Sequence, residues 1–332
     1  MKELWMKPWL LIPPRWAHEL GPYALRISSI FQPNEIPIWQ PLRWRNFEFR
    51  NPLGLAGGVD KNGESVEDWW HHGVGFLEVG TVTPKPQSPN PGKIMARDLP
   101  THSLWNRMGF PSFGAEEVLA NLKTIEEKKT PLFLNLGKNR NTTLETASED
   151  YTHLMRTFQD VADIFILNIS SPNTQGLRLL QKSENFEKFL TPLVKLAKKL
   201  NSKPLIIKLS PDENDESLAQ MILTARQSGI DGFVLTNTTT QRFGVPFPIE
   251  GGMSGVPLKT RSTECLKIAV ETLGKSRDCL LISAGGVMNP EDVFERLALG
   301  ADLVEVYTTL IYEGPLFFRK VAKAWDAKKT TK

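Results

Sequence analysis

Apolar residues along the chain gather into eight short runs rich in β-branched side chains, separated by longer stretches with helical spacing. The runs cover residues 53–59, 76–82, 133–138, 164–170, 205–210, 232–238, 280–287 and 303–310. Amphipathic stretches follow most of the later runs, at residues 184–200, 216–229, 263–273 and 290–299. Near-continuous apolar strands that alternate with helices indicate a parallel sheet covered on both faces. Eight such units predict an α/β fold of the (β/α)8 type, the TIM barrel.

A doubly wound open sheet is the alternative arrangement of the same alternating units. It is disfavoured because no Gly-x-Gly-x-x-Gly turn follows the first run. A chain of 332 residues suits a barrel with one additional element. We therefore expect residues 43–332 to form the barrel and residues 1–42 to form a small helical extension.

The extension is rich in Trp mixed with Lys, Arg and Pro. Apolar spacing predicts a helix over 14–30, followed by a linker at 31–37. No apolar run of the chain reaches the ~18–20 residues needed to cross a bilayer. Breaks at Lys7, Pro8 and Pro13 make the start a poor signal peptide, so we expect it to be retained. Such a helix either lies in a membrane surface or packs on the barrel floor.

Charge and cysteine content exclude several classes of function. The formal net charge is +3, from 40 Lys and Arg against 37 Asp and Glu, and no basic stripe with interleaved aromatic residues occurs, so nucleic-acid binding is not expected. Cys265 and Cys279 have no metal-type spacing, so neither a metal site nor a disulfide framework is expected. Both are interpreted as ordinary small, buried residues.

Polar residues stand where the runs end, and in a barrel of this type the catalytic groups lie at the carboxyl ends of the strands. The set is dominated by carboxamides and contains neither His nor Cys at the strand ends. Because a carboxamide both donates and accepts hydrogen bonds, this set suits a flat heterocycle edged with N–H and C=O groups, such as a pyrimidinedione or the outer ring of a flavin. The carboxamides are Asn106, Asn135, Asn168, Asn173 and Asn237.

A phosphate site is expected at the ends of the last two runs. Gly285 and Gly286 follow the seventh run, and Tyr307 and Thr308 follow the eighth, at the address where barrels of this type often bind phosphate through backbone N–H groups. Phosphate there and amide-rich edges elsewhere together indicate FMN. Lys208, on the fifth run, either places positive charge near the pyrimidine end of the flavin or forms a strand-end ion pair.

Five motifs in order carry a resemblance to a known family. They are Asn51-Pro-Leu-Gly-Leu-Ala-Gly-Gly-Val-Asp-Lys, Gly80-Thr-Val-Thr-Pro-Lys-Pro-Gln, Asn106-Arg-Met-Gly-Phe, Asn168-Ile-Ser-Ser-Pro-Asn-Thr-Gln-Gly-Leu-Arg and Thr236-Asn-Thr-Thr. In order and spacing they closely resemble dihydroorotate dehydrogenases, over essentially residues 14–325. The resemblance implies oxidation of dihydroorotate to orotate in pyrimidine synthesis, with hydride transfer to FMN.

The resemblance also implies roles for individual residues. Ser171 resembles the base that removes the C5 proton of the substrate, with Thr174 and a water as a relay and Ser170 as the competing assignment. The residues that resemble the orotate-binding set are Lys61, Asn106, Arg107, Met108, Gly109, Phe110, Asn168, Asn173, Asn237 and Thr238. Those that resemble the FMN-binding set are Gly57, Gly58, Val59, Asp60, Lys61, Thr81, Asn135, Asn168, Lys208, Thr236, Gly255, Gly286, Tyr307 and Thr308.

The class within the family is indicated by Ser171 and by the N-terminal extension. A Cys fills the position of Ser171 in the soluble class, so Ser is typical of the membrane-associated class that reduces a quinone. His18, Arg97 and Tyr307 resemble residues near the quinone head group. We therefore expect a peripheral protein on the cytoplasmic face of a bacterial membrane, with dihydroorotate and a membrane quinone as small-molecule partners and no obligate protein partner.

Three readings compete with this one: a soluble-class enzyme that uses fumarate or NAD, another FMN barrel with a different carbonyl substrate, and a barrel that only binds. The sequence departs from the family pattern in three places. Gln175 stands where Pro is common, Gly57 where Ala is common, and Trp105 where a smaller aliphatic residue is usual.

Overall fold

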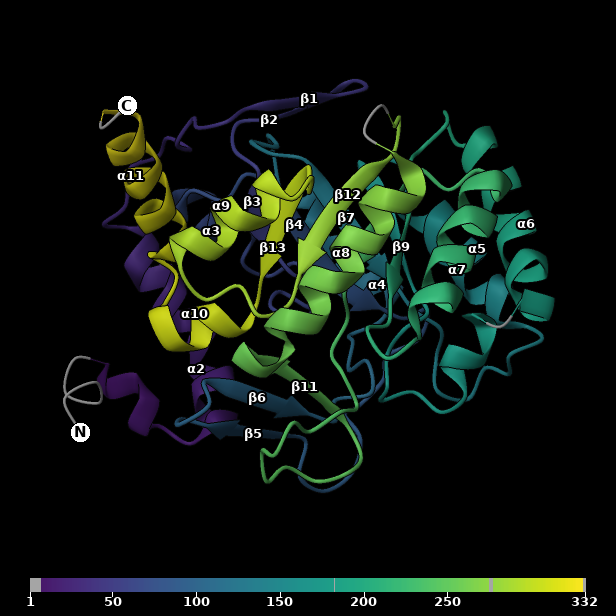
Figure 1. Cartoon of the computed structure of the whole chain (residues 1–332), viewed down its shortest axis with the longest axis horizontal. Helices are drawn as coiled ribbons and strands as arrows, with labels where there is room; N and C mark the ends of the chain where they lie inside the picture. The colour runs from purple at the N-terminus through teal and green to yellow at the C-terminus, as the bar shows by residue number, and fades with distance from the viewer. Residues whose placement is uncertain (1–6, 182, 275–276, 331–332) are drawn as a thin grey trace.

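Eight parallel strands close into a barrel in the computed structural model, which describes residues 7–181, 183–274 and 277–330 (Figure 1). Around the barrel the strands follow the order β10-β12-β13-β3-β4-β7-β8-β9. Their bounds are β3 Leu53–Leu55, β4 Leu77–Val82, β7 Leu132–Leu136, β8 Ile164–Asn168, β9 Leu205–Leu209, β10 Gly232–Leu235, β12 Leu280–Ala284 and β13 Leu303–Val306. Each run predicted from the sequence overlaps one barrel strand. The predicted (β/α)8 fold is confirmed, and the doubly wound alternative is wrong.

Helices cover the outside of the barrel. They are α3 Val66–His72, α4 Ala115–Lys123, α5 Ala147–Thr157, α6 Ser183–Lys199, α7 Asp215–Ser228, α8 Lys259–Leu273, α9 Pro290–Ala298, α10 Thr308–Glu313 and α11 Phe317–Thr330, with short 3-10 turns η2 Leu177–Gln181 and η3 Val256–Leu258. The helices expected after the later strands are therefore present. The sequence pattern had not resolved α3, α4 and α5.

A short hairpin closes the amino-terminal end of the barrel. Strands β1 (Leu42–Trp44) and β2 (Phe47–Phe49) pair antiparallel, and Phe49 packs edge-on against Phe76 and Phe133, with ring centroids 6.1 Å from each. These rings belong to an apolar cluster formed by inward-facing strand residues. The interior at this end is therefore a packed core, and any cavity must lie toward the opposite end.

A three-stranded antiparallel sheet lies at that opposite end (Figure 1). It consists of β5 (Met95–Asp98), β6 (Ser103–Asn106) and β11 (Gly252–Gly255), in the order β11-β6-β5. The first two strands come from the connection after β4, and the third comes from the connection after β10. Two long loops therefore build a cover over the carboxyl ends of the barrel strands.

The N-terminal unit consists of η1 (Pro8–Leu11) and α2 (Pro14–Ser29), close to the predicted helix 14–30. It is fastened at one end to the cover sheet and at the other to helix α3. The guanidinium of Arg97 donates to the carbonyls of Leu10 and Ile12 at 2.6 and 2.8 Å, and Ser29 Oγ donates to Asp68 Oδ1 of α3 at 2.7 Å.

The outer face of α2 is apolar and open to solvent. Its exposed large apolar side chains are Trp16, Leu20, Tyr23 and Ile27, and Ile30 and Phe31 continue the surface beyond the helix. We call these six residues the apolar face of α2. The alternative of a helix buried on the barrel floor is wrong, because the hairpin β1–β2 occupies that place. No helix in the described ranges is long and apolar enough to cross a membrane.

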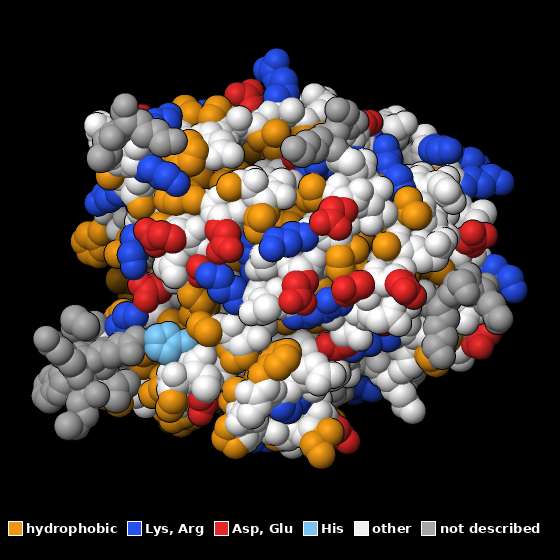
Figure 2. All heavy atoms as spheres, viewed as in Figure 1, with side chains coloured by type: hydrophobic (Ala, Val, Ile, Leu, Met, Phe, Trp, Pro, Cys, Tyr) orange, Lys and Arg blue, Asp and Glu red, His pale blue; other side chains and the backbone are white. Residues whose placement is uncertain are grey.

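Acidic and basic side chains are interspersed over the face of the molecule formed by α7, α8 and α9 (Figure 2). No large surface of one sign stands out in that view. This agrees with the small net charge of the sequence.

Candidate active site

A cavity opens between the carboxyl ends of the barrel strands and the cover sheet. The space it encloses, open mouth included, is about 1160 Å³. Its wall contains residues from the ends of all eight strands and from β6 and β11. Every barrel strand and the cover sheet therefore contribute to this one cavity.

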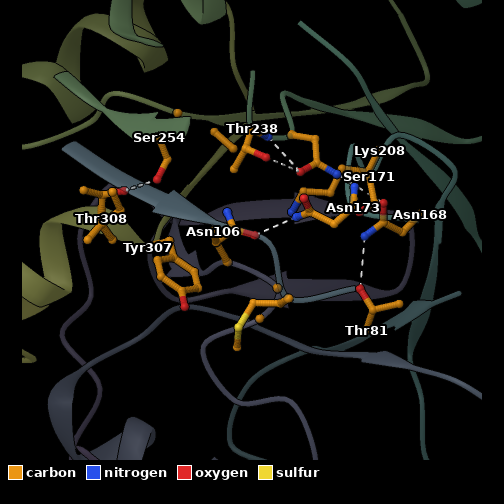
Figure 3. Close-up of a pocket in the computed structure, with 18 of the residues that line it drawn as sticks. Thr81, Asn106, Asn168, Ser171, Asn173, Lys208, Thr238, Ser254, Tyr307 and Thr308 are labelled. Atoms are coloured by element: carbon orange, nitrogen blue, oxygen red, sulfur yellow. Dashed lines mark hydrogen bonds between the residues drawn. The ribbon is translucent and has the colours of Figure 1, made fainter. Parts of the chain in front are cut away.

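The carboxamides predicted from the strand ends meet in this cavity, where they form two hydrogen-bonded groups. Asn168 Nδ2 donates to Thr81 Oγ1 at 3.0 Å and to Asn135 Oδ1 at 3.2 Å, and Asn237 Nδ2 donates to Asn168 Oδ1 at 3.2 Å. On the other side Asn173 Nδ2 donates to Asn106 Oδ1 at 2.7 Å (Figure 3). Each amide is thus fixed in orientation, which is how a site presents donors and acceptors to a planar ligand.

The two neighbouring serines after β8 have different surroundings. Ser171 lines the cavity, and its Oγ accepts a hydrogen bond from the backbone N–H of Asn173 at 3.2 Å. Ser170 is fully buried behind the wall, and its Oγ accepts from Asn237 Nδ2 at 3.0 Å. Thr174 Oγ1 is buried close by, with no hydrogen-bond partner in the part of the chain that the structure describes. Of the two serines, only Ser171 can reach a ligand directly.

Lys61 and Lys208 bring positive charge to different parts of the wall. Burial lowers the pKa of Lys61 to about 8, against a smaller opposing effect of Asp60. Lys208 forms ion pairs with Glu305 at 2.7 Å and with Glu78 at 3.1 Å. Burial alone would lower the pKa of Lys208, but the charges of Glu305 and Glu78 outweigh it and raise that pKa. The ion-pair interpretation of Lys208 is therefore confirmed. Lys208 also lines the cavity, and its contact with a flavin stays a prediction.

The end of the cavity near β12 and β13 is lined by main chain. Gly285, Gly286 and Thr308 lie there, and Thr308 Oγ1 donates to Ser254 Oγ at 2.8 Å (Figure 3). Gly286 has φ +72°, and a Cβ on it would lie 2.3 Å from Lys259 Cα, so this turn requires Gly. Thr308 begins α10, so its N–H has no acceptor within the helix. This backbone arrangement suits an anion such as a phosphate group.

Arg296 stabilises the same turn from behind. Its fully buried guanidinium donates to the carbonyl of Gly285 at 3.1 Å and to that of Lys259 at 3.0 Å. Burial lowers its pKa to about 10, so it remains a cation at neutral pH. The turn is thus held in place by a positive charge that does not itself line the cavity.

Several residues proposed for ligand binding lie outside the cavity wall. Asp60 accepts hydrogen bonds from the N–H groups of Gly63, Glu64 and Ser65 at 2.9–3.1 Å and so orders the loop before α3. Arg107 pairs with Glu250 at 3.0 Å in the loop that precedes β11. The remaining residues of this kind, outside the wall of the described cavity, are Val59, Arg97 and Gly255.

The other predicted residues line the cavity. They are Gly57, Gly58, Lys61, Thr81, Asn106, Met108, Gly109, Phe110, Asn135, Asn168, Ser171, Asn173, Lys208, Thr236, Asn237, Thr238, Gly286, Tyr307 and Thr308. The side chain of His18 and the whole of Trp5 lie outside the part of the chain that the structure describes.

Sequence reasoning missed Glu78, Glu305, Arg296 and Ser254. For both glutamates the available signal was a charged residue inside an apolar run. They lie within strands and not at the strand ends, where catalytic groups were expected. Among the described residues no group of three or more His, Cys, Asp or Glu side chains is arranged to hold a metal ion.

A closed (β/α)8 barrel with a polar cavity at the carboxyl ends of its strands has the architecture of a barrel enzyme. The comparisons with known proteins identify the family. A sequence profile described as dihydroorotate dehydrogenase matches residues 42–328. The chain belongs to the dihydroorotate dehydrogenase family.

Individual relatives agree with this assignment. A dihydroorotate dehydrogenase (quinone) of Thermus thermophilus is 44% identical over 278 residues, which are 82% of this chain and 78% of that protein. One of Sulfurimonas denitrificans is 38% identical over 328 residues, 95% of this chain and 91% of that protein. A ligand-free dihydroorotate dehydrogenase structure from Eimeria tenella superposes with a TM-score of 0.85 at 32% identity and covers 93% of each chain.

Proposed function

We propose that the protein oxidises dihydroorotate to orotate with FMN as its bound cofactor and passes the electrons to a membrane quinone. The observation that carries this is the composition of one cavity wall, where carboxamides, Lys61 and Ser171 stand opposite a backbone anion site. Family membership and relatives named as quinone-dependent enzymes support the same reaction. The oxidation removes a proton from C5 and a hydride from C6 of the substrate, and FMN, when bound, supplies the hydride acceptor.

FMN fits the groups that the cavity offers. The turn at Gly285 and Gly286, with Thr308 and Ser254, would hold the phosphate. Thr81, Asn135, Asn168 and Lys208 would contact the ring system from the floor of the cavity. Asn173 Oδ1 and Glu305 Oε2 are buried with no hydrogen-bond partner among the described residues, and both residues line the cavity, so the wall still has polar groups to satisfy.

In this proposal Ser171 removes the C5 proton. A serine hydroxyl is a weak base at neutral pH, so its own proton has to leave as it accepts the new one. Thr174 would receive that proton through a water, and its hydroxyl is buried and unpartnered among the described residues, which supports this role. Lys61 and the asparagines bind the carboxylate and the ring amides of the substrate and stabilise the charge that develops on it.

The N-terminal unit, residues 1–42, is proposed as the membrane-facing part. The apolar face of α2 presents Trp and Tyr to solvent in the manner of a helix that lies in a bilayer surface. A second, open cavity is lined by Glu19 of α2 together with Met95 and Met108, and the latter two also line the main cavity. This continuity supports a quinone route from α2 toward the FMN site, near Tyr307. We place the protein peripherally on the cytoplasmic face of the cell membrane.

The test is a comparison of electron acceptors with the purified full chain. We expect a yellow protein with one FMN per chain, and dihydroorotate-dependent reduction of ubiquinone or menaquinone but not of fumarate or NAD. Fumarate or NAD as the preferred acceptor would indicate the soluble class instead. A flavin that dihydroorotate fails to reduce would indicate a different carbonyl substrate, and a chain that binds no FMN after reconstitution would contradict the proposal.

A further inference from the structure

The eight barrel strands contain three ionisable side chains, and all three meet. They are Glu78 on β4, Lys208 on β9 and Glu305 on β13. The other five strands, β3, β7, β8, β10 and β12, contain only uncharged residues. We call Glu78, Lys208 and Glu305 the barrel triad. Because isolated charges are very costly to bury, their meeting is a specific arrangement and not a by-product of strand composition.

The geometry of the triad is asymmetric. Lys208 Nζ lies 3.1 and 3.2 Å from the two carboxylate oxygens of Glu78, and Asn135 Nδ2 donates to Glu78 Oε1. Glu305 receives one contact, from Lys208 Nζ to Oε1 at 2.7 Å. Its Oε2 is buried and has no hydrogen-bond partner among the described residues. Glu78 is thus fully satisfied as an acceptor, whereas Glu305 has one oxygen to spare.

The net charge of the triad also indicates that its two glutamates differ. With both glutamates ionised, one Lys would leave the triad with a net charge of −1, enclosed in a core whose other strand residues are uncharged. The three side chains are at most 7% exposed, so water does not compensate that charge. Two carboxyl groups that share one cation in such surroundings retain one proton, carried by one of the two groups.

The neighbours of each carboxyl decide which one keeps the proton. Burial alone would raise the pKa of Glu78, but Lys208 and the hydrogen bonds that Glu78 accepts outweigh it and lower that pKa. For Glu305, burial and then the charge of Glu78 raise the pKa well above its usual value, against the opposing effect of Lys208. No other titratable group of the described chain faces Glu305 from the adjacent strands β12 and β3.

We propose that Glu305 is held as a neutral carboxylic acid whose O–H donates a hydrogen bond into the cavity, to an acceptor atom of the FMN bound there, and so favours the reduced cofactor. Glu305 lines the cavity, whereas Glu78 does not belong to its wall. The inference rests on FMN binding as proposed above. Glu305 keeps its proton throughout, and the hydride still comes from dihydroorotate.

The preference for the reduced cofactor follows from charge. A hydrogen bond to an acceptor that gains negative charge is stronger than one to a neutral acceptor. When Glu305 ionises, the donor is lost and the triad becomes an anion beside an electron-rich ring. Rising pH therefore weakens the binding of reduced FMN more than that of oxidised FMN.

Gly57 belongs to the same arrangement. A Cβ on Gly57 would lie 2.3 Å from Glu78 Oε1, which Lys208 and Asn135 hold in place. The departure from the family pattern at this position, Gly for Ala, thus gives the Glu78 carboxylate its space. Glu78 serves here as a positioning residue, whereas Lys208 and Glu305 are the members of the triad that line the cavity.

Infrared spectroscopy of the full chain tests the protonation state without any turnover. The wild-type spectrum is expected to contain the carbonyl band of a buried neutral acid at neutral pH, with and without FMN, and the band should shift when FMN binds. E305Q should lose the band. E78Q should lose it as well, because Glu305 then pairs alone with Lys208 and ionises. E216Q, which alters an exposed carboxyl on α7, is the matched control and should keep it.

A second measurement follows the ratio of the dissociation constants of reduced and oxidised FMN against pH. Above the pKa of Glu305 the wild-type ratio should rise by about tenfold per pH unit, in addition to the dependence of free FMN. E305Q should retain only the dependence of free FMN, and its affinity for oxidised FMN should change little because Gln also donates. A band that persists in E305Q, a band that FMN does not shift, or the same pH slope in E305Q and wild type would each overturn the inference. Absence of FMN binding in the wild-type protein would contradict the proposed function instead.

Discussion

Ser170 and Ser171 are consecutive residues with opposite surroundings, and this makes the base assignment testable. Ser171→Ala removes the only hydroxyl of the pair that lines the cavity and leaves the carboxamide network intact. Loss of a general base typically costs about 10²–10⁴-fold. We expect flavin reduction by dihydroorotate, followed by stopped-flow absorbance, to slow by that order while the orotate dissociation constant changes little.

Ser170→Ala is the matched control for that experiment. It removes the acceptor of Asn237 Nδ2 from behind the wall and should slow flavin reduction far less. If Ser170→Ala cripples reduction and Ser171→Ala leaves it unchanged, the base is Ser170.

The pKa of Lys61 leads us to expect that substrate binding depends on pH. Burial lowers its pKa to about 8, so the cation that would bind the substrate carboxylate is present below pH 8 and is lost above it. We expect the orotate dissociation constant to rise above pH 8 by up to about tenfold per pH unit. Isothermal titration between pH 6 and pH 9.5 measures it.

Two variants define the origin of that dependence. Lys61→Met should bind orotate weakly at every pH, with a flat profile. Lys123→Met, at the exposed end of α4, should retain the wild-type profile. A profile that still bends near pH 8 in Lys61→Met would assign the titration to another group.

Residues at strand ends were predictable from the sequence because the barrel rule fixes where catalytic groups lie. Asn106, Asn135, Asn168, Asn173 and Asn237 were placed in one cavity on that basis, and the structure brings them together there. The meeting of Glu78 and Glu305, which lie within strands, was not predictable from the sequence. An inward-facing Glu and an outward-facing Glu differ by one position in register, and the interior partner of each glutamate lies on a strand distant in the chain.

At the scale of elements, the proposed membrane contact of α2 can be tested without removing the N-terminal unit. Deleting the N-terminal unit would also remove the carbonyls of Leu10 and Ile12 that Arg97 binds. Substitution of Trp16 and Tyr23 by Ser is the sharper change, since these side chains are 64% and 70% exposed.

The double variant should retain flavin reduction by dihydroorotate, because the cavity is untouched. Burying one large apolar side chain contributes about 1.5–3 kcal/mol. Binding to phospholipid vesicles, measured by sedimentation, should therefore weaken by at least tenfold, and the KM for a long-tailed quinone should rise.

Ile38→Ser is the control for that variant, as Ile38 is 67% exposed but lies outside the apolar face of α2. It should leave both measurements unchanged. If the Trp16 and Tyr23 variant binds vesicles and reduces the quinone like the wild type, α2 serves only a structural role.

Elements with a strong hydrophobic periodicity were predictable from the sequence, and short elements without it were not. The barrel strands follow from apolar runs, and α6–α9 follow from amphipathic stretches. Strands β5 and β11 have no alternation that a pattern could detect, since all four residues of β5 are partly exposed and β11 reads Gly-Met-Ser-Gly. They form because β6 offers them hydrogen-bonding partners across the barrel mouth.

At the scale of the whole molecule, eight alternating units were enough to predict a closed barrel, since few other architectures cover eight parallel strands on both faces. Two features of the molecule are visible only in the folded chain and were not predictable from the sequence. The hairpin β1–β2 closes one end with Phe49, and the cover sheet narrows the other, so the cavity at the strand ends lies under that sheet. Both come from segments of the chain that lie outside the eight alternating strand and helix units.

The barrel triad also sets a limit on how this fold can be strengthened. Replacing a buried ionic cluster with apolar side chains of similar volume is often neutral or stabilising by about 1–4 kcal/mol. Apolar residues in place of Glu78, Lys208 and Glu305 would therefore be neutral or stabilising for the barrel. With the role inferred above, this layer maintains activity at the expense of thermal stability. A more heat-resistant version of this protein has to be sought in the outer helices and surface loops, with that layer left as it is.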